Sequence, residues 1–201
     1  MKDCFCDGSF YIGGRVCLRP VRGDYADGVF VSQLRNHYRQ WYFNPQVVTP
    51  SSHMAWCAQK SPYDEVWIVE QTVSSRPIGV TSLTIDPQAR TAEYGRTMVH
   101  PQFLGQGYAT EIEWTAMYLG FEFFRLTMLS GELLPVNPIA KIHDLTGWQR
   151  EGLNVPGHTR PGVDTLYITI DRAQWGALSR PDFVRWLYEK YGFALALGEL
   201  D

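Results

Sequence analysis

The amino-acid sequence predicts a mixed α/β fold, in which a mostly antiparallel central sheet contains one parallel strand pair and carries helices on both faces. Three β-like segments, 65–70, 78–85 and 91–99, are joined by short links, which favour antiparallel hairpins. The stretch 91–129 has the order strand, loop, helix, strand, and this order requires a parallel pair because its connection crosses over the sheet. Helices on both faces would bury such a sheet.

The remaining elements flank these segments. A short apolar strand is predicted at 16–21, and Asp24 can cap a helix that runs to about Arg35. Thr49 and Pro50 open a second helix as its N-cap and first residue. The pattern further predicts a helix from Tyr108 to about Phe121, a strand at 125–129, a short helix at 138–145, strands within 147–152 and 165–170, and helical pieces at 172–178 and 182–191.

Length and composition indicate one globular domain. The chain has 201 residues, of which 45% are hydrophobic and 19% charged, so it can bury a core without disulfides or metals. Residues 1–14 are predicted to be a loose lead-in, 15–171 the domain, and 172–201 a helical extension packed on it. In that extension Phe183, Trp186, Leu187 and Tyr191 have the spacing of an amphipathic helix, which would cover the core or the interface of a homodimer.

The charge pattern weighs against nucleic-acid and membrane partners. The 18 basic and 21 acidic residues give a net charge of −3, and no basic run is present to neutralise phosphates. No apolar stretch reaches the roughly 18 to 20 residues of a membrane span. The polar start of the chain lacks an apolar signal core, so a cytoplasmic location is expected. Cys4 and Cys6 form a C-x-C pair without a second pair at zinc spacing, so we expect reduced thiols and no metal site.

The most informative segment joins the strand at 91–99 to the helix that begins at Tyr108. Gly105 and Gly107 can adopt positive φ and leave room for a ligand near the backbone. The N–H groups of such a loop and of the helix start can bind a phosphate or pyrophosphate. The loop is not a Walker loop, because Tyr108 follows Gly107, and it is not a Rossmann fingerprint, because Thr110 replaces the third glycine.

The loop Gln102-Phe103-Leu104-Gly105-Gln106-Gly107-Tyr108-Ala109 resembles the Q-x-x-G-x-G pyrophosphate-binding loop of the GNAT superfamily of acetyl-CoA-dependent N-acetyltransferases. The element order from about Arg15 to Asp171 is similar to that family as well. The resemblance implies a GNAT-like acyl-CoA N-acyltransferase fold with acetyl-CoA as co-substrate. It also implies that these eight residues bind the cofactor, and that Met98 and Val99 hold its pantetheine arm through the backbone.

A second block, Asn137 to Trp148, resembles the family's N-x-x-A...(Y/H)-x-x-x-G-F pattern. When it is aligned on Gly147 and Trp148, His143 stands where many members have a tyrosine general acid. Asn137 is then one position out of register, and the resemblance implies a cofactor contact for it. Trp148 replaces the usual phenylalanine.

A third resemblance concerns the acceptor side. Leu34-Arg35-Asn36, Trp41-Tyr42-Phe43-Asn44, His53 and Trp56 are similar to GNAT enzymes that act on amino-sugar nucleotides, with the pseudaminic-acid pathway acetyltransferases the nearest branch. The ribosomal-protein-alanine acetyltransferases share this layout. The resemblance implies that Arg35, Asn36, Trp41 and Tyr42 bind the acceptor. Trp41 can instead plug the space between the first two helices, and His53 and Trp56 have the spacing of packing residues on one helix face.

The resemblance implies direct attack of a primary amine on the thioester. Glu93, on the strand before the loop, is the predicted general base; alternatively it faces solvent or pairs with Arg96 or Arg125. His143 is the predicted general acid, because histidine exchanges protons near neutral pH; alternatively it packs near the cofactor mouth. His100, beside Pro101, is expected to be a loop residue without a catalytic role.

Several acceptors are compatible with this interpretation. The first choice is a small-molecule amine on an amino-sugar nucleotide, followed by a protein N-terminus or ribosomal protein, and then by a polyamine or aminoglycoside. A different class is a non-catalytic module that binds coenzyme A through the same loop without a working base and acid. A zinc module built on Cys4 and Cys6 is the remaining alternative.

Overall fold

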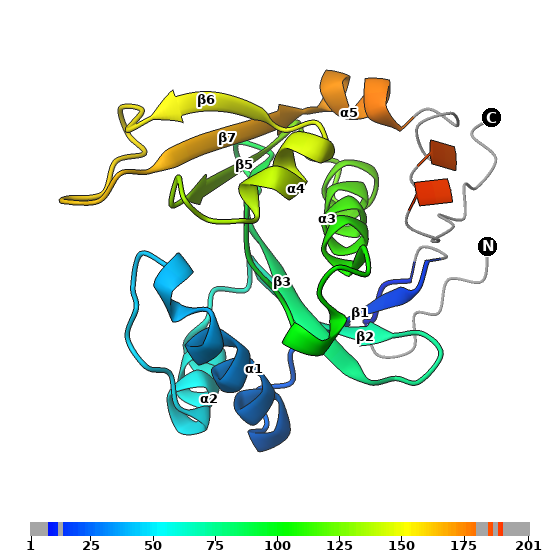
Figure 1. The fold of residues 1–201 in the computed structure, drawn as a ribbon, viewed down its shortest axis with the longest axis vertical. Coiled ribbons are helices and arrows are strands. Elements are labelled where there is room, and N and C mark those ends of the chain that lie inside the picture. Colours follow the sequence, from blue (N-terminus) through cyan, green and yellow to red (C-terminus); the bar gives the residue numbers. More distant parts are fainter. Residues whose placement is uncertain (1–7, 12–13, 180–184, 187–188, 191–201) are drawn as a thin grey trace.

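The computed structural model describes residues 8–11, 14–179, 185–186 and 189–190. It contains a seven-stranded sheet in the order β1-β2-β3-β4-β5-β7-β6 (Figure 1). β4 and β5 run parallel and the other neighbours run antiparallel. This arrangement confirms the predicted fold class.

The strands are β1 (Val16–Pro20), β2 (Asp64–Gln71), β3 (Pro77–Asp86), β4 (Thr91–Val99), β5 (Met128–Leu133), β6 (Gln149–Leu153) and β7 (Leu166–Asp171). The α-helices are α1 (Tyr25–His37), α2 (Pro50–Gln59), α3 (Tyr108–Tyr118), α4 (Ala140–Leu145) and α5 (Arg172–Leu178). Short 3-10 turns, η1 and η2, occupy Arg39–Trp41 and Pro101–Phe103, and a π-helical turn, η3, follows α3 at Leu119–Phe123.

The two predicted N-caps begin their helices. The Asp24 side chain accepts a hydrogen bond from the Asp27 N–H at the start of α1. Thr49 and Ser52 form a reciprocal capping box at the start of α2, where Pro50 occupies the first turn. These side chains satisfy backbone N–H groups that a helix start leaves without an intrahelical partner.

The predicted strand at 125–129 is wrong in position, because β5 begins at Met128 and ends at Leu133. The residues before it complete the turn that ends η3. Arg125 has φ of +57°, and the Leu126 N–H donates to the Gly120 carbonyl. The strand continues through Gly131, where a Cβ would lie 3.2 Å from the Ile168 side chain of β7. Close approach of two strands therefore explains a glycine inside this strand.

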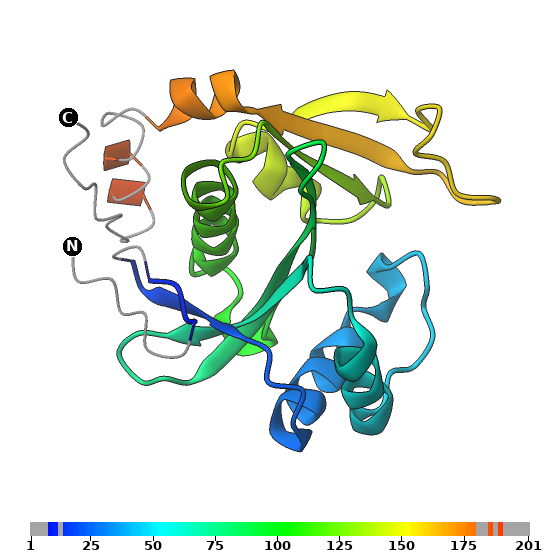
Figure 2. The ribbon, with the colours of Figure 1, turned by 180° about the vertical axis from the view of Figure 1, so that it is seen from behind.

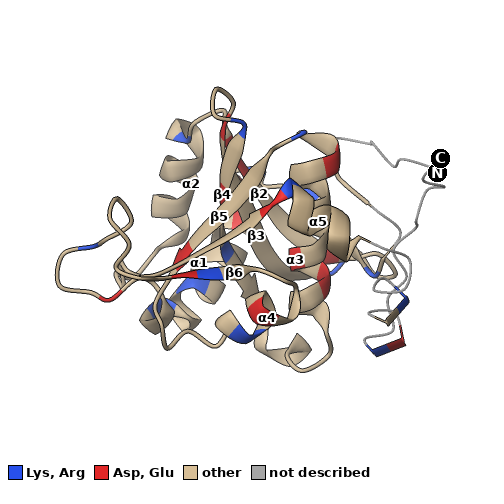
Figure 3. Ribbon diagram, turned by 90° about the horizontal axis from the view of Figure 1, so that it is seen from above, with Lys and Arg blue, Asp and Glu red and all other residues tan. Residues whose placement is uncertain are grey.

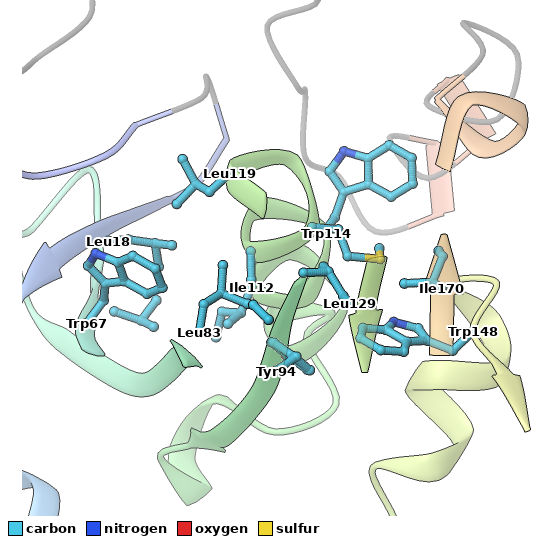
Figure 4. Close-up of a cluster of buried hydrophobic side chains, with 14 of the residues drawn as sticks. Leu18, Trp67, Leu83, Tyr94, Ile112, Trp114, Leu119, Leu129, Trp148 and Ile170 are labelled. Carbon is cyan, nitrogen blue, oxygen red and sulfur yellow. The ribbon is translucent and has the colours of Figure 1, made fainter. Parts of the chain in front are cut away.

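The core lies mainly between α3 and one face of the sheet. Figure 4 shows Leu18 and Trp67 from the first strands facing Ile112 on α3, with Leu129 and Ile170 beyond them. A second, smaller cluster packs α1 against the opposite face through Val31, Leu34, Val66, Ile68, Val80 and Met98, and Trp56 of α2 packs against this cluster. α3 is buried on nearly all sides, since every residue from Thr110 to Met117 is buried.

α5 packs against α3 and the turn after it through Trp175. The Trp175 ring lies 4.7 Å from Trp114 and stacks on Phe121 at 5.6 Å between ring centroids. Its indole N–H donates to the Glu122 carboxylate at 2.6 Å. The start of the extension therefore packs on the same core. Most of the predicted helix at 182–191, including Phe183, Leu187 and Tyr191, lies outside the described residues, as do Cys4 and Cys6.

Charged residues of both signs are interspersed along the ribbon when the molecule is seen from above (Figure 3). This view agrees with the small net charge of −3. Within the described part of the chain, no helix has the length and apolar character that crossing a membrane requires.

Candidate active site

The site begins where β4 and β5 separate. The two strands pair over three positions only, and the last pair is Glu93 with Ser130. β4 also carries a bulge, because its register with β3 shifts between Val80 and Ser82, and Arg96 takes a φ of +53° there. A bulge bends its strand and increases the local twist, so the two halves of the sheet diverge beyond this point (Figure 1 and Figure 2).

A cleft of about 400 Å³ opens between the diverging strands. Its walls come from both halves of the chain: the end of α1 and the loop after it, β4, the loop before α3, β5 and α4. The lining residues are Tyr38, Trp41, Tyr42, Phe43, Tyr94, Gly95, Arg96, Thr97, Met98, Val99, Leu104, Gly105, Ala109, Gly131, Glu132, Leu133, Asn137, Pro138, Ile139, Ile142, His143 and Ile168. Beyond Glu93 β4 has no pairing with β5, which leaves backbone groups on its edge facing the cleft.

The predicted phosphate loop forms one end of the cleft. Gly107 is the N-cap of α3 with φ of +80° and has no side chain to cap the helix, so the first N–H groups of α3 remain for an anion. Gly105 has φ of +73°, and a Cβ built on it would meet no atom within 4 Å. Leu104, Gly105 and Ala109 line the cleft. The backbone here fits a pyrophosphate that approaches the helix start.

Other residues of the predicted loop hold its shape. The Gln102 amide oxygen accepts a hydrogen bond from Arg76 at 2.6 Å, and its carbonyl accepts one from the Gln106 side chain at 2.9 Å. Phe103 and Tyr108 are buried with their rings edge to face at 5.8 Å. The side chains of Gln102, Phe103, Gln106 and Tyr108 do not line the cleft. His100 lies at the start of this loop, where its Nδ1 accepts a hydrogen bond from the Gln102 N–H at 3.4 Å.

Met98, Val99 and Asn137 line the cleft where the cofactor arm was predicted. The Tyr38 hydroxyl donates to the Val99 carbonyl at 2.6 Å and so ties the end of α1 to the end of β4. The Asn137 side chain donates to the Trp41 carbonyl at 3.4 Å. Asn137 therefore joins the segment before α4 to the loop after α1, on the two sides of the cleft.

Two of the four predicted acceptor residues line the cleft, namely Trp41 and Tyr42. The other two stabilise the loop that carries them. The Arg35 guanidinium lies 3.5 Å from the Tyr42 ring centroid and donates to the Asn44 carbonyl. Asn36 exchanges two hydrogen bonds with the backbone of Val48, at 2.7 and 2.8 Å. Burial raises the pKa of Tyr42 to about 12, so its hydroxyl stays protonated at neutral pH.

His53 and Trp56 lie in the packing around α2. His53 is buried, its ring centroid is 5.6 Å from that of Trp56, and burial lowers its pKa. Trp56 packs against the second core cluster. Neither residue lines the cleft.

A charged bridge crosses the acceptor side of the cleft. Glu132, a lining residue on β5, accepts hydrogen bonds from Arg160 at 2.8 Å and from His158 at 3.0 Å. Arg160 belongs to the loop between β6 and β7, and its guanidinium lies 4.3 Å from the Phe43 ring centroid. The β6–β7 loop thereby contacts the loop after α1. Sequence reasoning missed this bridge, because no local pattern links residues so far apart.

Glu93 lies where the cleft begins, at the last β4–β5 pair, and is exposed rather than part of the lining. Partial burial raises its pKa, and the Glu132 carboxylate raises it further, while Arg96 and Arg160 act in the opposite direction. A carboxylate with a raised pKa is a better proton acceptor, which is the property that a general base needs.

His143 is buried on α4 and lines the cleft. Its Nδ1 lies 3.0 Å from Oε2 of Glu113, a fully buried residue of α3. The rings of Tyr94 and Trp148 flank the imidazole at 5.9 and 5.4 Å between centroids. Sequence reasoning missed Glu113, which stands in a helix without a distinct polar face.

The described residues contain no group of three or more histidine, cysteine, aspartate or glutamate side chains that could hold a metal ion. The Cys57 thiol is not part of a disulfide, and its Sγ lies 3.4 Å from Nε2 of His53.

Comparison with known proteins identifies this architecture. The family model described as an acetyltransferase (GNAT) domain matches residues 15–141, more than half of the chain. A comparison of the sequence with curated proteins finds no match. Among solved structures, a GCN5-related N-acetyltransferase from Brucella melitensis is similar with a TM-score of 0.68 at 23% identity, over 86% of this chain and 82% of that one. The spermidine N-acetyltransferase from Vibrio cholerae, solved with CoA and spermine, is similar with a TM-score of 0.67 at 20% identity, over 80% and 98% of the two chains.

Proposed function

The chain belongs to the GNAT acetyltransferase family, whose members are acetyl-CoA-dependent acyltransferases, and on that premise we propose that it acetylates the primary amine of an amino-sugar nucleotide. One observation carries the proposal: a single cleft joins the uncapped start of α3 to an aromatic and charged wall. The first end suits the pyrophosphate of acetyl-CoA, and the second suits a ring-bearing, anionic amine.

Different residues of the cleft carry out the separate steps of acyl transfer. The loop 105–109 and the free edge of β4 would hold the cofactor, which supplies the thioester carbonyl that the amine attacks. Glu93 takes the proton that the amine loses, directly or through water. As the C–N bond forms and the C–S bond breaks, His143 gives a proton to the departing sulfur. Positioning of both substrates in one cleft contributes further to the rate.

The charges on the acceptor side favour an anionic amine. Glu132 is already paired with Arg160, and Asp64 lies 4.0 Å from Arg96, a second arginine at the cleft. A polyamine would have to displace these guanidinium groups from the carboxylates. A phosphate can instead bind the arginines, and a sugar or base ring can stack on Trp41 or Tyr42. An amino-sugar nucleotide carries all of these groups.

A polyamine is the second candidate. The similar enzyme from Vibrio cholerae acts on spermidine and spermine by its name, and it shares the fold at 20% identity. The carboxylates Glu93 and Glu132 offer an ammonium group a place in this chain if Arg160 moves aside. The two candidates therefore differ in the role of Arg160. It would bind the phosphate of an amino-sugar nucleotide, whereas it would have to leave Glu132 for a polyamine.

Turnover should be measured as release of the free thiol of CoA from acetyl-CoA in the presence of UDP-linked amino sugars, spermidine and an alanine-terminal peptide. We expect the highest kcat/KM with a UDP-linked amino sugar. Higher kcat/KM with spermidine would replace the proposed acceptor by the second candidate. An absence of thiol release with every acceptor would contradict the proposed activity.

Arg160→Ala should change KM for the two acceptors in opposite directions. It removes a guanidinium that a phosphate would bind, so we expect KM for a UDP-linked amino sugar to rise by about tenfold, the loss of roughly 1.4 kcal/mol. It also frees Glu132, so KM for spermidine should fall. Arg150→Ala is the matched control, because it removes an arginine whose carboxylate partner, Asp144, is exposed. Equal changes for both acceptors would exclude Arg160 from acceptor recognition.

Glu93→Gln should remove the acid limb of the pH profile. Because the pKa of Glu93 is raised, the fall of kcat/KM in acid should have its midpoint above the ordinary glutamate pKa of about 4.3. Loss of the base should lower kcat/KM at neutral pH by roughly a hundredfold. Glu65→Gln is the control, since burial also raises the pKa of this carboxyl, which lies on β2 outside the cleft lining. An unchanged acid limb in Glu93→Gln would assign the base elsewhere.

A further inference from the structure

Glu113 is unusual among the buried acids of this protein. Three carboxylates are buried in the described part of the chain: Asp27, Glu111 and Glu113. Asp27 is paired with Arg19 and Glu111 with Arg15, at 2.8 and 2.9 Å. Glu113 faces a histidine instead. A buried carboxylate without a cationic partner is costly, so its retention in the core needs a reason other than packing.

The contacts of Glu113 orient it toward the cleft wall. One carboxylate oxygen accepts a hydrogen bond from the Thr146 hydroxyl, which follows α4. The other oxygen lies 3.0 Å from Nδ1 of His143. This contact is not aligned as a hydrogen bond, and within the described part of the chain neither atom has another hydrogen-bond partner. The two buried atoms therefore depend on each other, and a proton held between them satisfies both.

We propose that Glu113 is the positioning residue for His143. Its carboxylate occupies the Nδ1 edge of the imidazole and holds the Nδ1–H there, so that the protonated ring gives its Nε2–H to the departing sulfur and keeps the proton on Nδ1. Tyr94 and Trp148 limit the tilt of the ring from both sides. A second group that fixes the tautomer and orientation of a catalytic histidine is a recurrent device in enzymes. The inference rests on the proposed function of His143 as general acid and adds a residue behind it.

The experiment combines kinetics with a spectroscopic signature. Glu113→Leu keeps the volume and removes the charge, so the fold should be retained or become more stable. With a UDP-linked amino sugar and acetyl-CoA, we expect kcat to fall between about tenfold and a hundredfold while KM for acetyl-CoA is unchanged. In the His143→Gln background the same change should have no further effect, because Glu113 acts through His143.

The matched control is Glu111→Gln, which neutralises another fully buried carboxylate on α3, one whose partner is Arg15. It should lower stability and leave kcat per folded molecule unchanged. ¹⁵N spectra of the His143 ring should show a protonated Nδ1 in the wild type and its loss in Glu113→Leu. Equal losses of kcat in both His143 backgrounds, or unchanged ring spectra, would overturn the inference. If no acceptor is turned over, the proposed function fails, while the ring spectra still decide the role of Glu113.

Discussion

Asp27→Ala is expected to lower the free energy of unfolding by about 3 to 5 kcal/mol, the range for removing one partner of a buried ion pair. Asp27 on α1 accepts two hydrogen bonds from the guanidinium of Arg19 on β1, at 2.8 and 3.0 Å, and one from the Arg22 N–H at 2.7 Å. Both side chains are less than one-tenth exposed. Without Asp27, Arg19 keeps Glu70, at 2.7 Å, as its one carboxylate partner among the described residues.

The stabilisation that Asp27 contributes to the fold should decrease as the pH falls. Burial raises the pKa of this carboxyl, but the bonds from Arg19 and the Arg22 N–H outweigh it and hold the pKa below its usual value. A lowered pKa in the folded state means that the stabilisation is present above the unfolded-state pKa of about 3.9 and is lost as the pH falls below it. The difference between wild type and Asp27→Ala should therefore shrink in acid.

Urea unfolding of the two proteins at pH 7 and pH 3 measures this difference. Asp144→Ala is the matched control, because Asp144 also pairs with an arginine through two hydrogen bonds, at 2.7 and 2.8 Å, but at the surface. It should leave the unfolding midpoint unchanged. If Asp27→Ala is as stable as Asp144→Ala at pH 7, the ion pair between Asp27 and Arg19 does not add to the free energy of unfolding.

The features that the sequence predicted well are local ones. Caps such as Asp24 and Thr49 act within one turn, and the glycines before Tyr108 act within one loop. The parallel pair follows from a single strand–helix–strand stretch. The position of β5 did not follow, because residues 125–127 have side chains that suit a strand but complete the turn after η3, where Arg125 has φ of +57° and the Leu126 N–H donates to the Gly120 carbonyl.

The residues that complete the site depend on distant contacts. Glu132 meets Arg160, and Arg160 meets Phe43, only after the β6–β7 loop and the loop after α1 are placed. Glu113 has no signal in the helical pattern, because every residue of α3 from Thr110 to Met117 is buried. A helix that is buried all round shows no polar face from which a functional acid could be recognised.

The second large effect is expected for Gly105→Trp, which should abolish binding of acetyl-CoA. Gly105 lines the cleft, and a side chain built on it enters open space rather than the protein. An indole there would occupy the place of the cofactor beside the uncapped start of α3. The substitution leaves the core untouched, so the protein should still fold.

Thermal unfolding with and without acetyl-CoA measures this effect. At a concentration about 100 times its dissociation constant, a ligand that binds only the folded state adds roughly 2.7 kcal/mol. The wild type should show the corresponding rise in Tm, and Gly105→Trp should show none. Its turnover with any acceptor should fall below detection.

Gly162→Trp separates the blocked cleft from backbone strain. Gly162 has φ of +74°, against +73° for Gly105, and a Cβ at either position meets nothing within 4 Å. Both variants therefore carry the same cost of a side chain at positive φ, but Gly162 lies in the β6–β7 loop, away from the start of α3. If Gly105→Trp and Gly162→Trp retain the same acetyl-CoA stabilisation, the loop before α3 does not bind the cofactor. If only Gly105→Trp loses it, the open space beside Gly105 is the place where the cofactor enters the cleft.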